Sequence, residues 1–427
     1  MLGLGWLLVA AAPADAARPN AHCLGAEPPR ACHVWTGKVV RVSDGDTIAV
    51  DLDRDGTRRA VKVRLTGIQA MELTRYGRLT RAGECHGVDA TERLEELVNE
   101  SGGRVRLAAQ DPASTTFGPR RRLRRQVSVR RDGVWTDAGA LLLQEGLALW
   151  FASEEEWAWN GRYSRLAEEA AARGVGIWDG RSCGTDQLGP AANALHLKVK
   201  WNANGNDGEN PNGEWVRIRN TDALHPLRLG GWWFRDSALR RYKFPRGAVV
   251  LAGGSIRLRI GEGTDDRNTY HWGLSGPVFD NATNDRKQKG DGGYLFDPHG
   301  NLRAHVQYPC RTSCHEPLAG KVALETHYGA PQYVRVRNTS NSTISLFQYE
   351  IERAPWFYEF DRNSLLMPGQ KLDLYVQRRE GSGKAFARSW GQPDSSLSDE
   401  AGAVTLRNPL GAPVVCNAWG GAPCPDV

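Results

Sequence analysis

A strand pattern that occurs twice constrains the second half of the chain more than any other feature. Residues 215–220 read WVRIRN and residues 333–338 read YVRVRN, so apolar and charged side chains alternate in both, 118 residues apart. Alternation with a period of two is typical of strands that bury one face. After residue 185, Gly, Asn and Asp turns separate more segments of this kind, and helical periodicity is nearly absent. We therefore expect two β-sandwiches, the second a degenerate repeat of the first.

The first half of the chain has a mixed pattern. Helical patterning is largely confined to the residues before 185, where strand-like segments also occur. A stretch rich in small residues, 185–193, ends this pattern and predicts a linker. A chain of 427 residues has room for two to four domains. We expect a multidomain, mainly β protein with domains at residues 34–184, 194–315 and 319–427.

Charged motifs in the first domain indicate phosphodiester chemistry. The turn Asp44-Gly45-Asp46-Thr47 offers carboxylates for a hard cation, Arg64 offers a guanidinium that matches a phosphate, and Glu72 could act as a base. Between residues 101 and 131 there are nine arginines and a single acid, and the whole chain carries a formal net charge of +6. Such a basic stripe attracts a polyanion. The alternative interpretations are a surface ion pair for Arg64 and a solvated loop for the stripe.

The order of these motifs resembles the staphylococcal-nuclease (thermonuclease) family over residues 34–184. The D-G-D-T turn, the R-L-x-G-I stretch that leads to Glu72, and the closing 138–148, 166–172 and Gly176-Ile177-Trp178 segments carry the resemblance. It implies a five-stranded OB-fold barrel with three helices that cleaves DNA and RNA with calcium. The expected activity is therefore that of a calcium-dependent phosphodiester hydrolase.

The resemblance also implies roles for individual residues. The catalytic arginine falls on Arg64 and the catalytic glutamate on Glu72, while Asp46 becomes a calcium ligand with Asp44 nearby. The second catalytic arginine falls on Arg124, or on Arg125 if the strand carries a one-residue bulge. The residues expected to bind nucleic acid are the remaining arginines of the cluster, Arg120, Arg121, Arg122 and Arg125.

One position departs from the family pattern. The family usually reads D-T-P-E where this chain reads Gln69-Ala70-Met71-Glu72, so an amide replaces a metal-binding carboxylate. The Gln69 oxygen can still bind calcium, together with Asp46 and backbone carbonyls, but one negative charge is missing. Two functions remain open. One is a calcium-dependent nuclease, and the other is a nucleic-acid-binding or cell-envelope protein on a weakened or inactive nuclease frame.

The second region resembles a lamin-tail domain, an immunoglobulin-like β-sandwich, over roughly residues 194–310. The resemblance rests on residues 213–220, 229–236, 251–255 and 290–297, and it returns in weaker form over 319–427. It implies a module for binding or anchoring, with a cell-envelope ligand as one possibility. The aromatic candidates for a ligand face are Trp232, Trp233, Trp356 and Phe357, although aromatic side chains more often fill the core of a sandwich.

The start of the chain predicts export. An apolar run at residues 1–12 is too short to span a bilayer, and it ends at Ala14-Asp15-Ala16, which matches a signal-peptidase site. We expect a signal peptide at residues 1–16, cleavage after Ala16, and a secreted mature chain without a transmembrane segment.

Eight cysteines in an exported chain predict disulfide bonds. Spacing favours Cys23 with Cys32, Cys310 with Cys314 and Cys416 with Cys424, which leaves Cys85 with Cys183. The alternative for Cys310, Cys314 and His315 is a zinc site, which would need a further ligand cluster.

Overall fold

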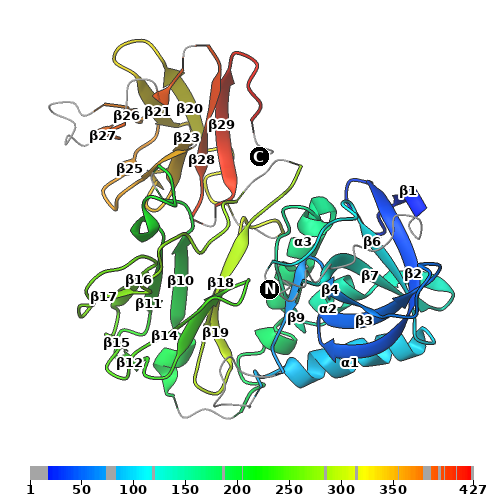
Figure 1. Ribbon diagram of the computed structural model, residues 1–427. Coiled ribbons are helices and arrows are strands. Elements are labelled where there is room, and N and C mark those ends of the chain that lie inside the picture. The colour runs from blue at the N-terminus through cyan, green and yellow to red at the C-terminus, as the bar shows by residue number, and fades with distance from the viewer. Residues whose placement is uncertain are drawn as a thin grey trace, which may run out of the picture. The chain divides into compact units, whose positions relative to one another are not determined.

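The structure is a computed structural model, and it describes residues 18–73, 83–117, 121–184, 188–203, 205–282, 286–312, 316–353, 355–377, 386–392, 396–398, 400–409 and 411–424. Strands dominate, as the alternating patterns predict (Figure 1). The chain divides into two compact units. The first holds residues up to 193 with 229–247 and 286–305, and the second holds 194–228, 248–285 and the residues from 306 onward. Within the described ranges, no helix has the length and apolar character needed to cross a membrane.

The main sheet of the first unit pairs its strands in a circuit. Its members are β2 (Ala31–Asp44), β3 (Thr47–Leu52), β4 (Val61–Leu65), β7 (Leu123–Arg131) and β6 (Arg104–Ala109). Neighbours in this order are paired, and β6 also pairs with β2. Only the β4–β7 contact is parallel among these five pairings. Inward-facing Ile48, Val63 and Val129 are fully buried, so the alternating pattern of the strands makes the core.

Three α-helices accompany this sheet: α1 (Gly87–Glu100), α2 (Ala138–Gln144) and α3 (Asn160–Arg173). The Asp137 side chain caps α2 by accepting a hydrogen bond from Ala140 N at 3.1 Å. The nuclease resemblance assigns residues 138–148 to a closing helical segment, and only the first part of this segment is helical. Gly146 has φ 69°, which ends the helix, and Ala148 begins strand β9 (Ala148–Trp150). This strand pairs with β5 (Ile68–Ala70), which carries Gln69.

Shorter elements complete the first part of the chain. They are β1 (Arg18–His22), which pairs with β2, and β8 (Val134–Asp137), which pairs with β7. Single 3-10 turns lie at Trp157–Trp159, Gly176–Trp178 and Pro190–Asn193, and another lies at Pro211–Gly213 in the region that follows.

The lamin-tail-like region forms two four-stranded sheets and a short two-stranded one. One sheet has the order β10 (Leu195–Lys200), β11 (Trp215–Asn220), β16 (Ser255–Arg259) and β17 (Thr269–His271). Another has the order β14 (Arg241–Lys243), β13 (Trp233–Asp236), β18 (Asp291–Phe296) and β19 (Leu302–Tyr308). The small sheet pairs β12 (Leu227–Arg228) with β15 (Val249–Val250).

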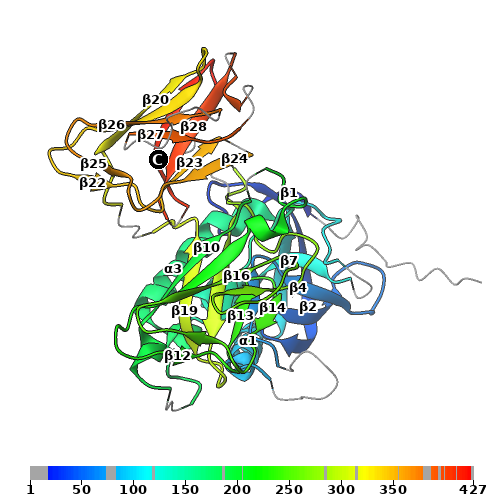
Figure 2. The ribbon, with the colours of Figure 1, turned by 90° about the vertical axis from the view of Figure 1, so that its left-hand side faces the viewer.

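The last region repeats this topology strand for strand. Its sheets are β20 (Val322–His327), β21 (Tyr333–Asn338), β26 (Lys371–Tyr375) and β27 (Ala387–Ser389), then β24 (Trp356–Glu359), β23 (Glu350–Arg353), β28 (Gly402–Arg407) and β29 (Pro413–Trp419), with β22 (Ile344–Ser345) on β25 (Leu365–Leu366). Figure 2 shows the two larger sheets in yellow to red. Val336 and Leu374 of one sheet share a hydrophobic core with Ile351 and Leu406 of the other.

Asn220 and Asn338 occupy equivalent positions in the two repeats, and their side chains make equivalent hydrogen bonds to the backbone. The Asn220 amide donates to His225 O at 2.7 Å, and the Asn338 amide donates to Ser342 O at 2.8 Å. Among the aromatic candidates, Trp232, Trp233 and Phe357 are buried and Trp356 is partly exposed. These three buried side chains are packing residues rather than an open ligand face.

Three of the predicted disulfides are present: Cys23–Cys32, Cys85–Cys183 and Cys416–Cys424. Cys310 is also disulfide-bonded, while its predicted partner Cys314 and His315 lie outside the described residues. The zinc interpretation loses its first ligand, because a disulfide sulfur is not a thiolate. Disulfides of this number are typical of proteins outside the cytoplasm. The predicted signal peptide lies outside the described residues.

Candidate functional site

A cavity of about 190 Å³ in the first unit collects all three predicted catalytic residues, Arg64, Glu72 and Arg124. Its lining includes Arg64, Gln69, Glu72, Arg122 and Arg124. The strand pairing explains why two arginines distant in sequence meet here. Strands β4 and β7 run parallel, and Arg64 stands opposite Arg124 in their register.

Arg64 is buried and contacts two of the three predicted metal ligands, Asp46 and Gln69. Its guanidinium forms a salt bridge with Asp46 and donates to the side-chain oxygen of Gln69. The other Asp46 oxygen, Oδ2, accepts from Ala70 N at 2.9 Å. Asp44 lies two residues before Asp46, and its side-chain Oδ1 accepts a hydrogen bond from Asp46 N at 3.1 Å. The D-G-D-T turn and the segment after β4 therefore meet around the Arg64 guanidinium.

The Gln69 amide nitrogen lies among the oxygens that a cation would need. Nε2 is 3.0 Å from Ala70 O, 3.2 Å from Glu72 Oε1 and 3.5 Å from Asp46 Oδ2. Its carbonyl oxygen points away from this centre and accepts from Arg64. Calcium binds through six to eight oxygens, whereas an amide N–H group repels a cation. As arranged, these residues do not fit a calcium ion, because the amide nitrogen and its two hydrogens lie among the oxygens that would bind the metal.

Glu72 lines the cavity in a half-buried position. Burial raises the pKa of its carboxyl, Asp44 and Glu84 raise it further, and Arg64 and Arg235 oppose the shift. A carboxylate with a raised pKa is a stronger base than an ordinary glutamate. The backbone of Glu72 is held by Glu84, whose Oε2 accepts from Glu72 N at 3.1 Å.

The remaining arginines of the cluster differ in their partners and in their exposure to solvent. Arg122 donates to Thr47 Oγ1 at 2.9 Å, and Arg124 pairs with Glu155 at 2.6 Å, and both line the cavity. Arg121 is exposed, and Arg120 lies outside the described residues.

Arg125 was expected to bind nucleic acid or to replace Arg124, and its placement argues against both roles. Its guanidinium is buried, stacks 4.6 Å over the Trp35 ring, and donates to Pro112 O at 2.7 Å. Burial lowers its pKa to about 10. Consecutive residues of a strand face opposite sides, so Arg125 points into the core while Arg124 points to the cavity.

Two residues that sequence reasoning missed lie beside the cavity. Phe117 is 84% exposed and stacks 5.3 Å from the Arg124 guanidinium. Phe117 and Lys62 line a second, wider cavity of about 620 Å³, which shares Arg122 and Thr116 with the first. An aromatic residue inside a basic, proline- and glycine-rich loop is a signal that could have found Phe117, because bases stack on exposed rings.

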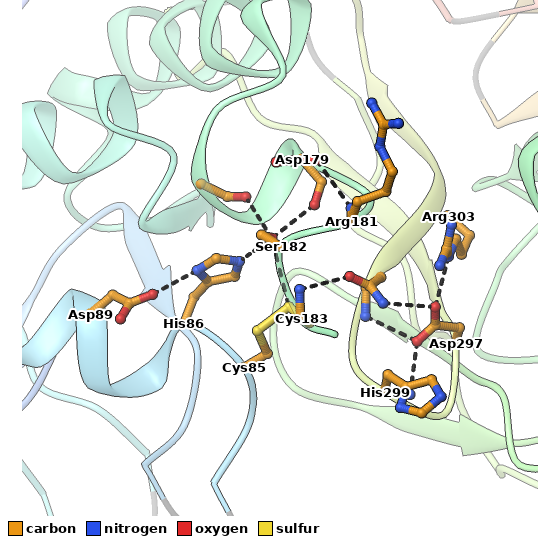
Figure 3. The surroundings of a disulfide bond; sticks show 12 residues. Cys85, His86, Asp89, Asp179, Arg181, Ser182, Cys183, Asp297, His299 and Arg303 are labelled. Atoms are coloured by element: carbon orange, nitrogen blue, oxygen red, sulfur yellow. Dashed lines mark hydrogen bonds and ion pairs between the residues drawn. A yellow bond between two sulfur atoms is a disulfide. The ribbon is translucent and has the colours of Figure 1, made fainter. Parts of the chain in front are cut away.

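A second polar cluster surrounds the Cys85–Cys183 disulfide (Figure 3). His86 contacts Ser182 Oγ through Nε2 and Asp89 through Nδ1, both at 2.8 Å, which is the hydrogen-bond order of a serine hydrolase triad. The amide of Ser182 donates to Asp179 O, and that of Cys183 donates to Asn301 Oδ1. Neither amide is left to stabilise an oxyanion, so this cluster does not fit acyl transfer. The two sulfurs beside His86 form a disulfide and offer no thiolate to a metal.

Comparison with known proteins identifies one part of the chain. The search of curated proteins found no match to the chain. Residues 197–310 match the family model described as Lamin Tail Domain. This match agrees with the resemblance seen in the sequence and with the strand content of the region. The chain therefore contains, at residues 197–310, a lamin-tail domain with an immunoglobulin-like fold.

Proposed function

We propose that residues 34–184 form a staphylococcal-nuclease-like OB-fold barrel that binds and hydrolyses phosphodiester bonds of nucleic acid. The circuit β2-β3-β4-β7-β6 supports the fold, because it has the closed strand order and the one parallel contact that such a barrel requires. The convergence of Glu72 with Arg64, Arg122 and Arg124 on one cavity carries the function.

Each of these side chains has a chemical task in the proposed reaction. Glu72 takes a proton from the water that attacks phosphorus, and its raised pKa suits this step. As the new P–O bond forms, the bond from phosphorus to the leaving oxygen breaks, and that oxygen takes a proton from solvent. Arg64 and Arg124 bind the non-bridging oxygens and stabilise the charge that grows on them in the transition state. Arg122 and Lys62 attract neighbouring phosphates, and Phe117 offers a ring on which a base can stack.

Calcium is the cofactor that the nuclease resemblance implies. Its entry would require the Gln69 amide nitrogen to leave the centre of the three oxygens that it now contacts. The proposed reaction therefore uses Glu72 and the arginines without calcium, and the dependence of activity on calcium tests the site.

A second function is nucleic-acid binding without cleavage, and the Gln69 contacts favour it specifically. An amide at the metal position preserves the phosphate-binding arginines while it removes the cation that such sites use. In either case we propose that the two sandwiches bind or anchor, the second as a degenerate lamin-tail repeat, and that the protein acts outside the cell.

The two functions can be separated with purified full chain. Cleavage of single- and double-stranded DNA and of RNA is measured with calcium and with chelator, for wild type and Glu72→Gln. Cleavage that disappears in Glu72→Gln supports the hydrolase. Tight, salt-dependent binding with no cleavage under any condition supports the binding protein.

A further inference from the structure

Part of the lamin-tail domain belongs to the same compact unit as the candidate site. Residues 229–247 and 286–305 fall in the first unit. Trp233, Tyr294 and Phe296 join one continuous hydrophobic cluster with Met71, the residue before Glu72. The Trp178 ring lies 6.1 Å from the Tyr294 ring. These strands are therefore packed on the first domain through a shared core.

Polar contacts strengthen the same junction. The Asn160 amide donates to Lys287 O at 2.8 Å, and Lys289 pairs with Glu154 at 2.6 Å. Because Asn160 is fully buried, its amide is a fixed point rather than a surface contact.

Two arginines of the β13–β14 hairpin meet the segment that carries Glu72. Arg235 is 1% exposed, and its Nη1 lies 3.6 Å from Glu84 Oε2 and 3.9 Å from Met71 Sδ. Arg241 lies 3.5 Å from the other Glu84 oxygen. Glu84 also binds the backbone of Glu72: its N donates to Glu72 O at 2.8 Å, and its side-chain Oε2 accepts from Glu72 N at 3.1 Å. The buried Glu84 carboxylate therefore connects the β13–β14 hairpin to Glu72, the proposed base.

The tip of this hairpin forms part of the cavity wall. Ala238 and Leu239 line the cavity together with the arginines. The tip is held in shape, because Asp236 Oδ1 accepts from Ala238 N at 2.9 Å and from Arg240 N at 2.8 Å. Leu239 has φ 86°, a conformation that non-glycine residues adopt only where the surroundings impose it.

We propose that the β13–β14 hairpin of the lamin-tail domain is a wall of the nucleic-acid-binding site, with Leu239 in contact with the bound strand. This inference rests on the proposed function, because it takes the cavity to be the place where the phosphodiester binds. The lamin-tail domain then has a part in substrate selection, in addition to any role as an anchor.

A charge placed at the hairpin tip tests this inference by binding alone. The probe is a fluorescein-labelled single-stranded DNA of about eight nucleotides, followed by anisotropy with chelator present and Glu72→Gln as the background to prevent cleavage. Leu239→Asp is expected to weaken binding at least tenfold, and Leu239→Arg to tighten it and to steepen the salt dependence by about one phosphate equivalent. Aspartate tolerates the left-handed backbone at this position.

Leu224 provides the matched control, since it is an 81% exposed leucine of the lamin-tail domain that does not line the cavity. Leu224→Asp and Leu224→Arg should leave the affinity within twofold of the background protein. Equal effects at positions 224 and 239, or none at 239 while the Arg124→Ala substitution weakens binding, would overturn the hairpin inference alone. Absence of DNA binding by all of these proteins would refute the proposed function, and the hairpin inference would fall with it.

Discussion

Exchange of Gln69 for aspartate is expected to create a calcium site at a cost in stability. The Gln69 amide nitrogen now lies within hydrogen-bond distance of Ala70 O, Glu72 Oε1 and Asp46 Oδ2. Without metal, Gln69→Asp removes this donor from Ala70 O and Glu72 Oε1, while Asp46 Oδ2 keeps its hydrogen bond from Ala70 N, and the loss costs about 1–3 kcal/mol of unfolding free energy. The added carboxylate also repels Asp46 and Glu72, so the loss should lie at the upper end of that range.

Calcium should reverse this loss in the variant. At a calcium concentration 100-fold above Kd, binding to the folded state alone adds about 2.7 kcal/mol. The assay is the thermal midpoint of the first unfolding transition with calcium and with chelator. Gln69→Asn is the matched control, because it has the length of aspartate without its charge. The reasoning is refuted if calcium raises the midpoint of wild type as much as that of Gln69→Asp, or if Gln69→Asn responds equally.

Further predictions concern stability. Replacement of Cys85 and Cys183 by serine should lower the unfolding free energy of the first unit by about 4–5 kcal/mol in the chain-entropy account, since the bond spans 98 residues, and urea denaturation would measure it. Burial raises the pKa of Glu156 from an ordinary 4.5 to about 7, so ionisation of Glu156 opposes folding as the pH rises from about 4.5 to 7. Parallel melts should therefore show that wild type loses stability relative to Glu156→Gln between pH 5 and pH 8. Glu350→Gln should destabilise the second unit, because it removes a negative charge beside Lys198, which is buried and whose pKa burial already lowers. An unchanged melting transition of this variant would contradict the prediction.

The sequence predicts the strand architecture and the meeting of Arg64 with Arg124. Alternation identifies the strands because burial of one face imposes it, and the parallel register of β4 and β7 then sets the two arginines opposite each other. The choice between Arg124 and Arg125 was open in the sequence. A shift of one residue moves a side chain to the other face of a strand, and only the placed strand shows that Arg125 faces the core.

Other features depend on contacts that no local pattern encodes. The orientation of the Gln69 amide follows from Arg64, which takes the oxygen and turns the nitrogen toward Asp46. The packing of the β13–β14 hairpin on the first domain arises between segments more than 160 residues apart, such as Met71 and Arg235. Phe117 differs from these features, because its place in a basic, proline- and glycine-rich loop is a local signal; it was missed because a single aromatic residue has no periodicity.

The central claim is that Glu72 acts as the base of a phosphodiesterase in the arginine-lined cavity. The most direct test is cleavage of labelled DNA and RNA by wild type and Glu72→Gln, with folding of both checked by melting. Glu72→Gln should fold at least as stably as wild type, because burial raises the folded pKa of Glu72 and its charge therefore opposes folding above that pKa. We expect cleavage by wild type and a loss of roughly a hundredfold or more in the variant. Equal cleavage by both proteins, or none by wild type on any substrate, would contradict the claim.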